Sequence, residues 1–404
     1  MTQYSAPSWS VPEYVGGNRL TLLRNGEQYF PALVAAIDAA QVEVFLETYI
    51  FADDRIGNLV ADALVRTAAR GVTTRLLIDG FGARDFASRF RDRLSKANAD
   101  VLVFGPEVSP WPPWRQRTRL RRMHRKLACV DGAVAFVGGI NIVDDYDTPD
   151  QTPPRYDYAV RIEGPLAERV RAEASKFWAR VSLRTFGRRW RLATLTGRAA
   201  RHALPPPGPD PGSQRAALVV RDNLRHRRDI EEAYLELIDA AREEAVIASA
   251  YFFPGRRFRI ALARAARRGV NVTLLLQGKP EYRLLYYASR ALYGPLLRVG
   301  VRIQEYHRSF LHAKVAVFDG RIASVGSSNI DPFSLLLARE ANVFVDDAEF
   351  AGKLRASLHE AIENGSRTVP RRNWQRLPFL IRARIWISYR IARLLIAFYG
   401  YDHQ

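Results

Sequence analysis

The sequence is poor in cysteine and in long apolar runs. Cys129 is the only cysteine among 404 residues, so an intramolecular disulfide is excluded and a reducing compartment is favoured. It stands in an apolar run, where we expect a small buried hydrophobic residue. No window offers about 18 consecutive apolar residues, so no transmembrane helix is expected. The polar N-terminus has no basic stretch followed by an apolar one, so we expect no signal peptide.

Positive charge is abundant and comes almost entirely from arginine. The formal net charge is +19, and only six of the 61 lysine and arginine residues are lysines. This charge predicts attraction to a polyanion, either a nucleic acid or an anionic lipid surface, and does not distinguish the two. Hydrophobic residues make up 48% of the chain and charged residues 25%, which is typical of a folded protein. The length suffices for two domains.

The two halves of the chain resemble each other. Residues 67–80 and 265–278 each predict the end of a helix, a glycine stop and a buried strand. Another apolar strand precedes each of them, at residues 42–51 and 245–253. Strands that alternate with helices predict two α/β units with largely buried sheets.

A run of prolines and glycines at residues 204–213 cannot hold a helix or a central strand. We interpret it as the connection between the duplicated halves. The expected divisions are an N-terminal domain over residues 1–203, a linker over 204–214, a C-terminal domain over 215–368 and a basic tail over 369–404.

Within the tail, residues 379–399 predict an amphipathic helix. Arg382, Arg390 and Arg393 fall on one side at the helical period, and apolar and aromatic residues cover most of the rest. Such a helix is typical of a bilayer interface, with arginines at the headgroups. The alternative is a helix docked on the second domain.

One short motif occurs in both halves with the same spacing. In each copy a lysine follows a histidine by two residues, and an aspartate follows the lysine by five. The copies are His124, Lys126 and Asp131 in the first half, and His312, Lys314 and Asp319 in the second. Because side chains alternate along a strand, each histidine and lysine point to one side. Apolar residues before each aspartate predict a buried strand, and the Asp-Gly pair that follows predicts a hairpin turn.

These residue types suit chemistry on a phosphodiester, whose negative charge repels nucleophiles. Lys126 and Lys314, with Asn141 and Asn329 downstream of the motifs, supply cations and amide donors for the non-bridging oxygens. A neutral imidazole can attack phosphorus, and a protonated one can donate to the leaving alkoxide. One histidine cannot do both at once, so we expect the two copies to face each other in one site. No metal or other cofactor is required, and no further cluster has metal-ligand spacing.

Both motif copies resemble the phospholipase D superfamily, and the wider context resembles its bacterial cardiolipin synthase branch, in the shorter type without N-terminal membrane spans. The similarity is carried by residues 25–31, 46–51, 121–126, 161–165 and 326–332. It implies an α/β fold of two pseudosymmetric α/β/α sandwich repeats, with the active site at their interface and an amphipathic helix at the C-terminus.

The resemblance also implies roles for further residues. Gly139 and Ser327 are expected to line the phosphate site with the two asparagines, and Asp157 and Glu340 to orient the histidines. The family often has an amide two residues before the second acid, where this chain has Ala338. Three further carboxylates are left open: Asp131 and Asp319 have either a chemical or a structural role, and Glu47 is a buried candidate near the cleft.

The implied mechanism is ping-pong. One histidine, which we expect to be His124, attacks the phosphorus of a phosphatidylglycerol, and His312 protonates the leaving glycerol. A hydroxyl of a second phosphatidylglycerol, deprotonated by His312, then displaces the phosphohistidine and yields cardiolipin. Because the site is nearly symmetric, the order of the two histidines remains open.

Aromatic residues interleaved with arginines at residues 109–122, 186–191 and 282–290 favour a membrane interface, with ordinary solvated basic faces as the alternative. We therefore expect phosphatidylglycerol and other anionic lipids as partners, no nucleic acid, and a peripheral location on the cytoplasmic face of a bacterial inner membrane. The competing hypotheses are a hydrolase or nuclease of the same superfamily, a transferase that uses another alcohol, and a non-catalytic membrane adaptor. The sequence does not predict the oligomeric state.

Overall fold

The computed structural model describes residues 12–83, 86–105, 122–147, 152–186, 211–222, 226–279, 282–332, 334, 338–375 and 377–400. Three expected features fall wholly or partly outside these ranges: the linker, the arginine- and tryptophan-rich stretch that leads into the first motif, and the patch that begins at residue 186.

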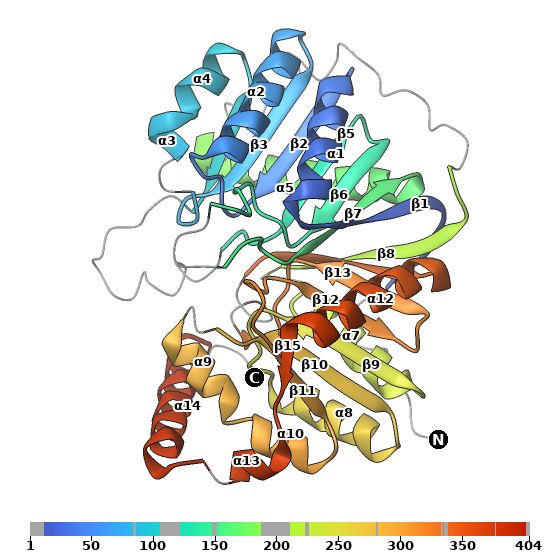
Figure 1. Cartoon of the computed structure of the whole chain (residues 1–404). Helices are drawn as coiled ribbons and strands as arrows, with labels where there is room; N and C mark the ends of the chain where they lie inside the picture. The colour runs from blue at the N-terminus through green and yellow to red at the C-terminus, as the bar shows by residue number, and fades with distance from the viewer. Residues whose placement is uncertain are drawn as a thin grey trace, which may run out of the picture.

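The described strands form one continuous sheet of fifteen, which both halves of the chain share (Figure 1). The strands of the first half are β1 (Val15–Arg24), β2 (Glu43–Thr48), β3 (Thr73–Asp79), β4 (Asp100–Phe104), β5 (Lys126–Val130), β6 (Val134–Gly138) and β7 (Tyr158–Glu163). Those of the second half are β8 (Gln214–Arg221), β9 (Glu244–Ser249), β10 (Asn271–Gln277), β11 (Arg302–Tyr306), β12 (Lys314–Phe318), β13 (Ile322–Gly326), β14 (Glu340–Asp346) and β15 (Ser366–Thr368).

The strand order repeats in the two halves. From the centre outwards it is β1-β7-β6-β5-β2-β3-β4 on one side and β8-β14-β13-β12-β9-β10-β11 on the other, with β15 added at the edge. The outer strands of each half pair in parallel and the inner ones antiparallel, and β1 pairs with β8 in the middle. The expected α/β fold of two pseudosymmetric repeats is confirmed, and the repeats share one sheet.

Helices cover the faces of this sheet. In the first half they are α1 (Asn25–Ala39), α2 (Arg55–Ala69), α3 (Phe86–Arg89), α4 (Arg91–Lys96) and α5 (Pro165–Phe186). In the second half they are α7 (Asp229–Ala240), α8 (Arg256–Arg267), α9 (Arg283–Arg290), α10 (Tyr293–Arg298), α12 (Ala348–Gly365), α13 (Arg371–Gln375) and α14 (Phe379–Gly400). One core joins α5 and α12 to strands of both halves, while α1 with α2 and α7 with α8 cover separate cores. The central core therefore holds the two repeats together.

The predicted Asp-Gly turns are present in both repeats. Asp131 and Gly132 have φ values of 52° and 68°, and Asp319 and Gly320 have 49° and 61°. Positive φ at both central residues defines the tight hairpin turn that joins β5 to β6 and β12 to β13. Each motif therefore lies on a hairpin whose first strand begins at the lysine.

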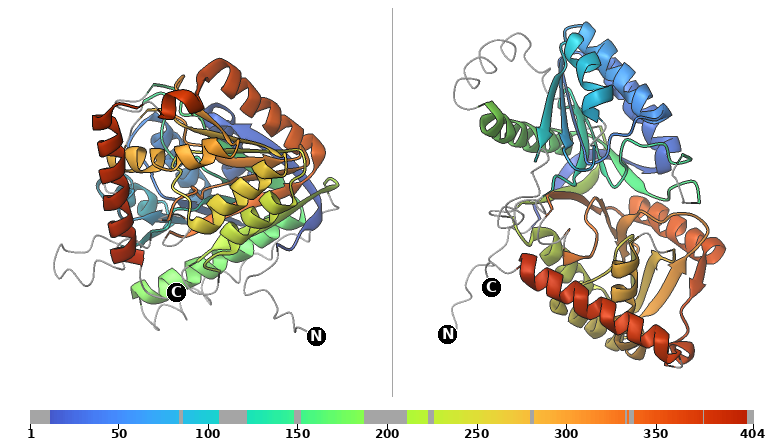
Figure 2. Two further views of the ribbon diagram at one scale, coloured as in Figure 1. Left: turned by 90° about the horizontal axis from the view of Figure 1, so that it is seen from below. Right: turned by 90° about the vertical axis from the view of Figure 1, so that its left-hand side faces the viewer.

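The C-terminal helix α14 lies along α9, on the outside of the second half (Figures 1 and 2). Its inner face buries Ile385, Ser388 and Ala392. About a third of a helical turn away, apolar side chains face solvent. They are Leu380, Ile387, Ile391 and Leu394, which are between 42% and 79% exposed. The helix is thus docked and still presents an apolar stripe. In the described part of the chain, no helix has the length and apolar character needed to cross a bilayer.

Candidate active site

The two motifs meet where the repeats face each other, and backbone hydrogen bonds set their alignment. The amide of His124 donates to the carbonyl of Arg339 at 3.0 Å, and the amide of His312 donates to the carbonyl of Tyr156 at 2.9 Å. Each of these hydrogen bonds lies next to a short parallel bridge. The bridge joins the residue before one motif histidine to the residue before the acid of the other repeat. Each histidine is therefore fixed against the opposite repeat.

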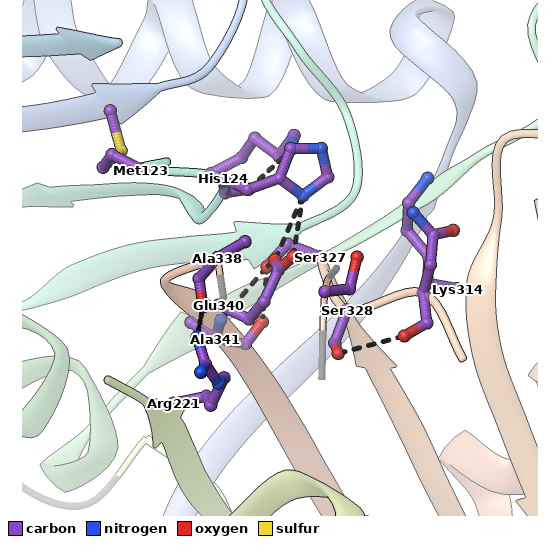
Figure 3. Close-up of polar contacts among 12 residues, drawn as sticks. Met123, His124, Arg221, Lys314, Ser327, Ser328, Ala338, Glu340 and Ala341 are labelled. Atoms are coloured by element: carbon purple, nitrogen blue, oxygen red, sulfur yellow. Dashed lines mark hydrogen bonds and ion pairs between the residues drawn. The ribbon is translucent and has the colours of Figure 1, made fainter. Parts of the chain in front are cut away.

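This alignment produces two crossed pairs between a histidine and a carboxylate. Nδ1 of His124 lies 2.9 Å from Oε1 and 3.2 Å from Oε2 of Glu340, which opens β14 of the second repeat (Figure 3). Nδ1 of His312 lies 2.6 Å from Oδ2 of Asp157, just before β7 of the first repeat. Asp157 and Glu340 thus stand where the resemblance placed them, each beside the histidine of the other motif. A carboxylate at Nδ1 leaves Nε2 as the nitrogen that faces the site.

The residue beside each acid differs between the repeats. The Ser327 hydroxyl donates to Oε2 of Glu340 at 2.5 Å (Figure 3), and its own amide donates to the carbonyl of Ala341. At the equivalent Gly139, a Cβ atom would lie only 2.4 Å from Oδ1 of Asp157, so glycine leaves room for this carboxylate. Here the Ser327 hydroxyl and the open space at Gly139 accommodate the acids, and a phosphate-binding role of the two residues stays a prediction.

Both motif lysines are buried at the bottom of the site. Nζ of Lys126 donates to the carbonyl of His124 at 2.6 Å, and Nζ of Lys314 donates to the carbonyl of His312. Burial lowers the pKa of Lys126 to about 7; Glu340 opposes this and Lys314 adds to it. Two buried lysines side by side with the two imidazoles suit an anionic ligand such as a phosphodiester.

Burial also controls the protonation of the histidines. It lowers the pKa of His124, and Glu340 partly opposes that effect. The pKa of His312 is well below its ordinary value, first because of burial and then because of Lys314 and Arg155. Burial raises the pKa of Asp157 to about 6. Both imidazoles are therefore neutral near pH 7 before substrate binds, and the charge of a bound phosphate would raise their pKa values.

The two predicted asparagines occupy equivalent buried positions. Oδ1 of Asn141 accepts from the amide of Ile50 at 3.2 Å, and Oδ1 of Asn329 accepts from the amide of Tyr251 at 3.4 Å. The side-chain oxygen of each asparagine thus accepts a hydrogen bond from the backbone that follows β2 or β9. The NH₂ group of each side chain is therefore the part that can donate to a ligand.

The motif aspartates have a structural role. The Asp131 carboxylate accepts from three consecutive amides, residues 41–43, each at 2.8 Å. The Asp319 carboxylate accepts from the amides of residues 242–244. Both aspartates follow the far end of the strand that begins at the motif lysine, about 16 Å along a fully extended chain. They anchor the hairpin to the segment before β2 or β9, which favours the structural alternative over a chemical role.

Glu47 has a partner in the core of the first repeat. It forms a buried ion pair with Arg125, whose Nη2 donates to Oε1 at 2.7 Å. The Arg125 guanidinium in turn lies 4.3 Å from the ring centre of Phe177 on α5. The strand pairing places Ala248 at the equivalent position of the second repeat. Glu47 therefore belongs to the packing between β2 and α5.

Sequence reasoning missed the aromatic rings beside the histidines. The ring of Tyr49 lies 4.9 Å from that of His124, centre to centre, and the ring of Phe310 stacks on His312 at 6.2 Å. Tyr49 directly follows β2, and this position was a visible signal because it lies within the stretch that carries the family resemblance. Its counterpart in the second repeat is Ala250, so the surroundings of the two histidines differ.

Among the residues that the structure describes, no group of three or more histidine, cysteine, aspartate or glutamate side chains is arranged to hold a metal ion. The polar groups that converge on the site are the two imidazoles, the two lysines and the two carboxamides. This set can bind a phosphodiester, attack it and move one proton.

Comparison with known proteins agrees with this geometry. Residues 33–178 and 234–362 each match the family described as "Cardiolipin synthase, PLD-like domain". Cardiolipin synthase B of Escherichia coli K12 is 40% identical over 373 residues, which cover 89% of this chain and 86% of that protein. The probable cardiolipin synthase YwiE of Bacillus subtilis is 30% identical over 354 residues, 87% of this chain and 68% of the relative.

Among solved structures, phosphatidylserine synthase of Haemophilus influenzae matches with a TM-score of 0.65. The match covers 93% of this chain and 94% of that one at 13% identity, so it supports the fold alone. The sequence relatives carry the assignment further. The chain belongs to the cardiolipin synthase family with phospholipase-D-like domains, a family of phosphatidyltransferases.

Proposed function

We propose that this enzyme is a cardiolipin synthase that joins two phosphatidylglycerol molecules through a phosphohistidine. The observation that carries the proposal is the pair of crossed histidine–carboxylate contacts, which aim two Nε2 atoms into one site between two lysines. The named function of the relatives supplies the substrate.

In the first step Nε2 of His124 attacks the phosphorus of the donor lipid. A P–N bond forms and the P–O bond to the headgroup glycerol breaks. His312, protonated once the anionic phosphate has bound, gives its Nε2 proton to the departing oxygen. Lys126, Lys314 and the two asparagine amides stabilise the charge on the non-bridging oxygens.

In the second step a hydroxyl of another phosphatidylglycerol enters where the glycerol left. His312, now neutral, takes the hydroxyl proton, a new P–O bond forms, and the P–N bond to His124 breaks. Cardiolipin leaves, and both histidines return to their starting protonation states, so each turnover releases one glycerol.

Two features favour His124 as the nucleophile. Its side chain is 18% exposed, compared with 11% for that of His312. A phosphorylated imidazole also gains positive charge, and Glu340, which Ser327 supports, lies against it. Asp157, with a pKa of about 6, can exchange a proton with His312 near neutral pH, as an acid and base requires.

The apolar stripe of α14 favours a lipid substrate over a nucleic acid. Four exposed apolar side chains on one face suit burial at the boundary of headgroups and acyl chains, and Trp386, which is 62% exposed, lies beside Arg390 on the neighbouring basic side. We propose peripheral association with the bacterial inner membrane through this helix, with α9 as its support.

The experiment offers the purified enzyme liposomes of phosphatidylglycerol, alone or mixed with phosphatidylethanolamine, and separately single-stranded DNA. Thin-layer chromatography resolves the lipids. Cardiolipin with one glycerol released per molecule is the expected result. Phosphatidic acid alone would indicate a hydrolase, and DNA cleavage without lipid turnover would indicate a nuclease.

A further inference from the structure

A pocket that is open to solvent lies at the carboxyl ends of β9 and β10 and against α9. Its lining is mostly aromatic and aliphatic, as is common in ligand sites. Residues that matter for its use are Ala250, Tyr251, Lys279, Tyr282, Leu285 and Tyr286.

The pocket exists where the two repeats differ. In the first repeat Tyr49 follows β2, and its ring lies against His124 and 5.5 Å from Nζ of Lys126. In the second repeat the residue at this position is Ala250, whose small side chain lines the pocket. The difference makes the nearly symmetric site asymmetric.

Two residues that line the pocket form hydrogen bonds with the segments that carry the catalytic groups. The amide of Ala250 donates to the carbonyl of Ala313, the residue after His312, at 3.1 Å. The amide of Tyr251 is held by Asn329, one of the two phosphate-binding amides. A molecule that reacts beside His312 therefore has this pocket as its neighbour.

The pocket also contains charge suited to a phospholipid. Lys279 lines it, and its Nζ donates to the Thr152 hydroxyl of the first repeat, so the cation lies at the junction of the two halves. The buried carboxylate of Asp331, which accepts from the amide of Ser334 at 3.1 Å, also belongs to the lining. A cation at the edge of an aromatic pocket matches a phosphate that carries an apolar group.

The same helix connects the pocket with the membrane-facing surface. Tyr282, Leu285 and Tyr286 lie at or just before the start of α9, and α14 packs along α9 (Figure 1). The outer face of α14 carries the exposed apolar stripe. A lipid that leaves a bilayer bound by α14 thus meets the pocket before it meets His312.

We propose that this pocket binds the acceptor phospholipid and thereby favours transfer over hydrolysis. The inference rests on the proposed function, in which the acceptor hydroxyl approaches from the side of His312. Beyond that hydroxyl the acceptor carries a phosphate and a diacylglycerol, which Lys279 and the aromatic lining hold. Water has neither group, so the pocket gives the lipid acceptor its advantage.

Leu285→Trp fills the pocket, and Leu284→Trp on the same helix is its control, because Leu284 does not line the pocket. Lys279→Gln removes the cation without adding bulk, and Lys353→Gln on α12, exposed and paired with Glu349, is the matched charge control. The substrate is phosphatidylglycerol in mixed micelles. Two quantities are measured: the glycerol burst of the first turnover, and the steady-state ratio of cardiolipin to phosphatidic acid.

Leu285→Trp and Lys279→Gln are each expected to lower the product ratio by about tenfold, with a first-turnover burst like that of the wild type and unchanged controls. An unchanged ratio in Lys279→Gln, or a burst that falls as much as the ratio, would overturn the acceptor assignment. If the wild type forms no cardiolipin, the proposed function fails instead, and the two failures are thereby distinguished.

Discussion

Nδ1 of His124 lies 2.9 Å from Oε1 of Glu340, a carboxylate 216 residues later in the chain and in the opposite repeat. The reciprocal contact joins His312 to Asp157 at 2.6 Å. Neither repeat therefore contains a histidine with its own supporting acid, and the duplicated chain acts as one catalytic unit. The parallel bridges next to each histidine hold the two repeats in the alignment that this crossing requires.

Replacing Glu340 should disable the histidine of the first motif. Glu340→Gln keeps the size of the side chain but removes the charge that supports a positive imidazole on His124. We expect kcat to fall by about 10²–10⁴-fold with a smaller change in KM. Steady-state kinetics with phosphatidylglycerol in mixed micelles measures both constants. Asp131→Asn is the control, since it should lower the melting temperature while the folded fraction keeps its kcat.

The pH dependence should report Lys126. Burial lowers its pKa to about 7, so the cation is present below that pH and is lost above it. We expect kcat/KM to fall as the pH rises through about 7, and the corresponding limb of kcat to lie at higher pH, because bound phosphate stabilises the cation. A pH series measures both. Lys126→Arg, which stays charged, should be slower and lack this limb. A kcat/KM that rises steadily to pH 9 contradicts the assignment.

The buried pair of Glu47 and Arg125 should affect stability and leave the chemistry intact. Glu47→Ala leaves the guanidinium buried without its partner, at a cost of about 3–5 kcal/mol in the free energy of unfolding. Urea titration measures this loss. Glu47→Ala with Arg125→Met removes both charges and should recover a large part of it. A double variant that is folded but inactive would show that Glu47 takes part in catalysis.

The outer face of α14 should control membrane binding. Ile387→Gln, Ile391→Gln and Leu394→Gln together remove apolar groups worth about 1.5–3 kcal/mol each when fully buried in lipid. We expect the fraction that sediments with phosphatidylglycerol vesicles to fall at least tenfold, with an unchanged circular dichroism spectrum. Leu59→Gln is the control, since Leu59 is 38% exposed on α2 of the other repeat. Equal sedimentation of the triple variant and wild type would exclude α14 as the anchor.

Much of this fold can be predicted from the sequence alone, because the duplication presents each sequence pattern twice. Helix ends, glycine stops, buried strands and Asp-Gly turns recur in both halves, and six motif residues recur with one spacing. The α/β repeats and the pairing of two motifs in one site follow from local pattern and residue chemistry.

Three features could not be predicted, and each depends on contacts between distant segments. The crossing of His124 with Glu340 follows from bridges across the interface, which no local pattern encodes. Asp131 was ambiguous because its partners are three backbone amides nearly 90 residues earlier in the chain. The pattern of α14 did not separate its buried from its exposed apolar side chains, because that division depends on how the helix packs against α9.

The central claim is that one phosphatidyl group is carried on His124 while His312 handles the proton. A phosphatidyl ester of 4-nitrophenol tests it, because this leaving group departs without protonation. With this substrate, His312→Ala should release one nitrophenolate per enzyme in a burst and accumulate an adduct that peptide mass spectrometry places on His124. His124→Ala should give no burst. A burst in His124→Ala with an adduct on His312 would reverse the roles, and no adduct in either variant would contradict the covalent mechanism.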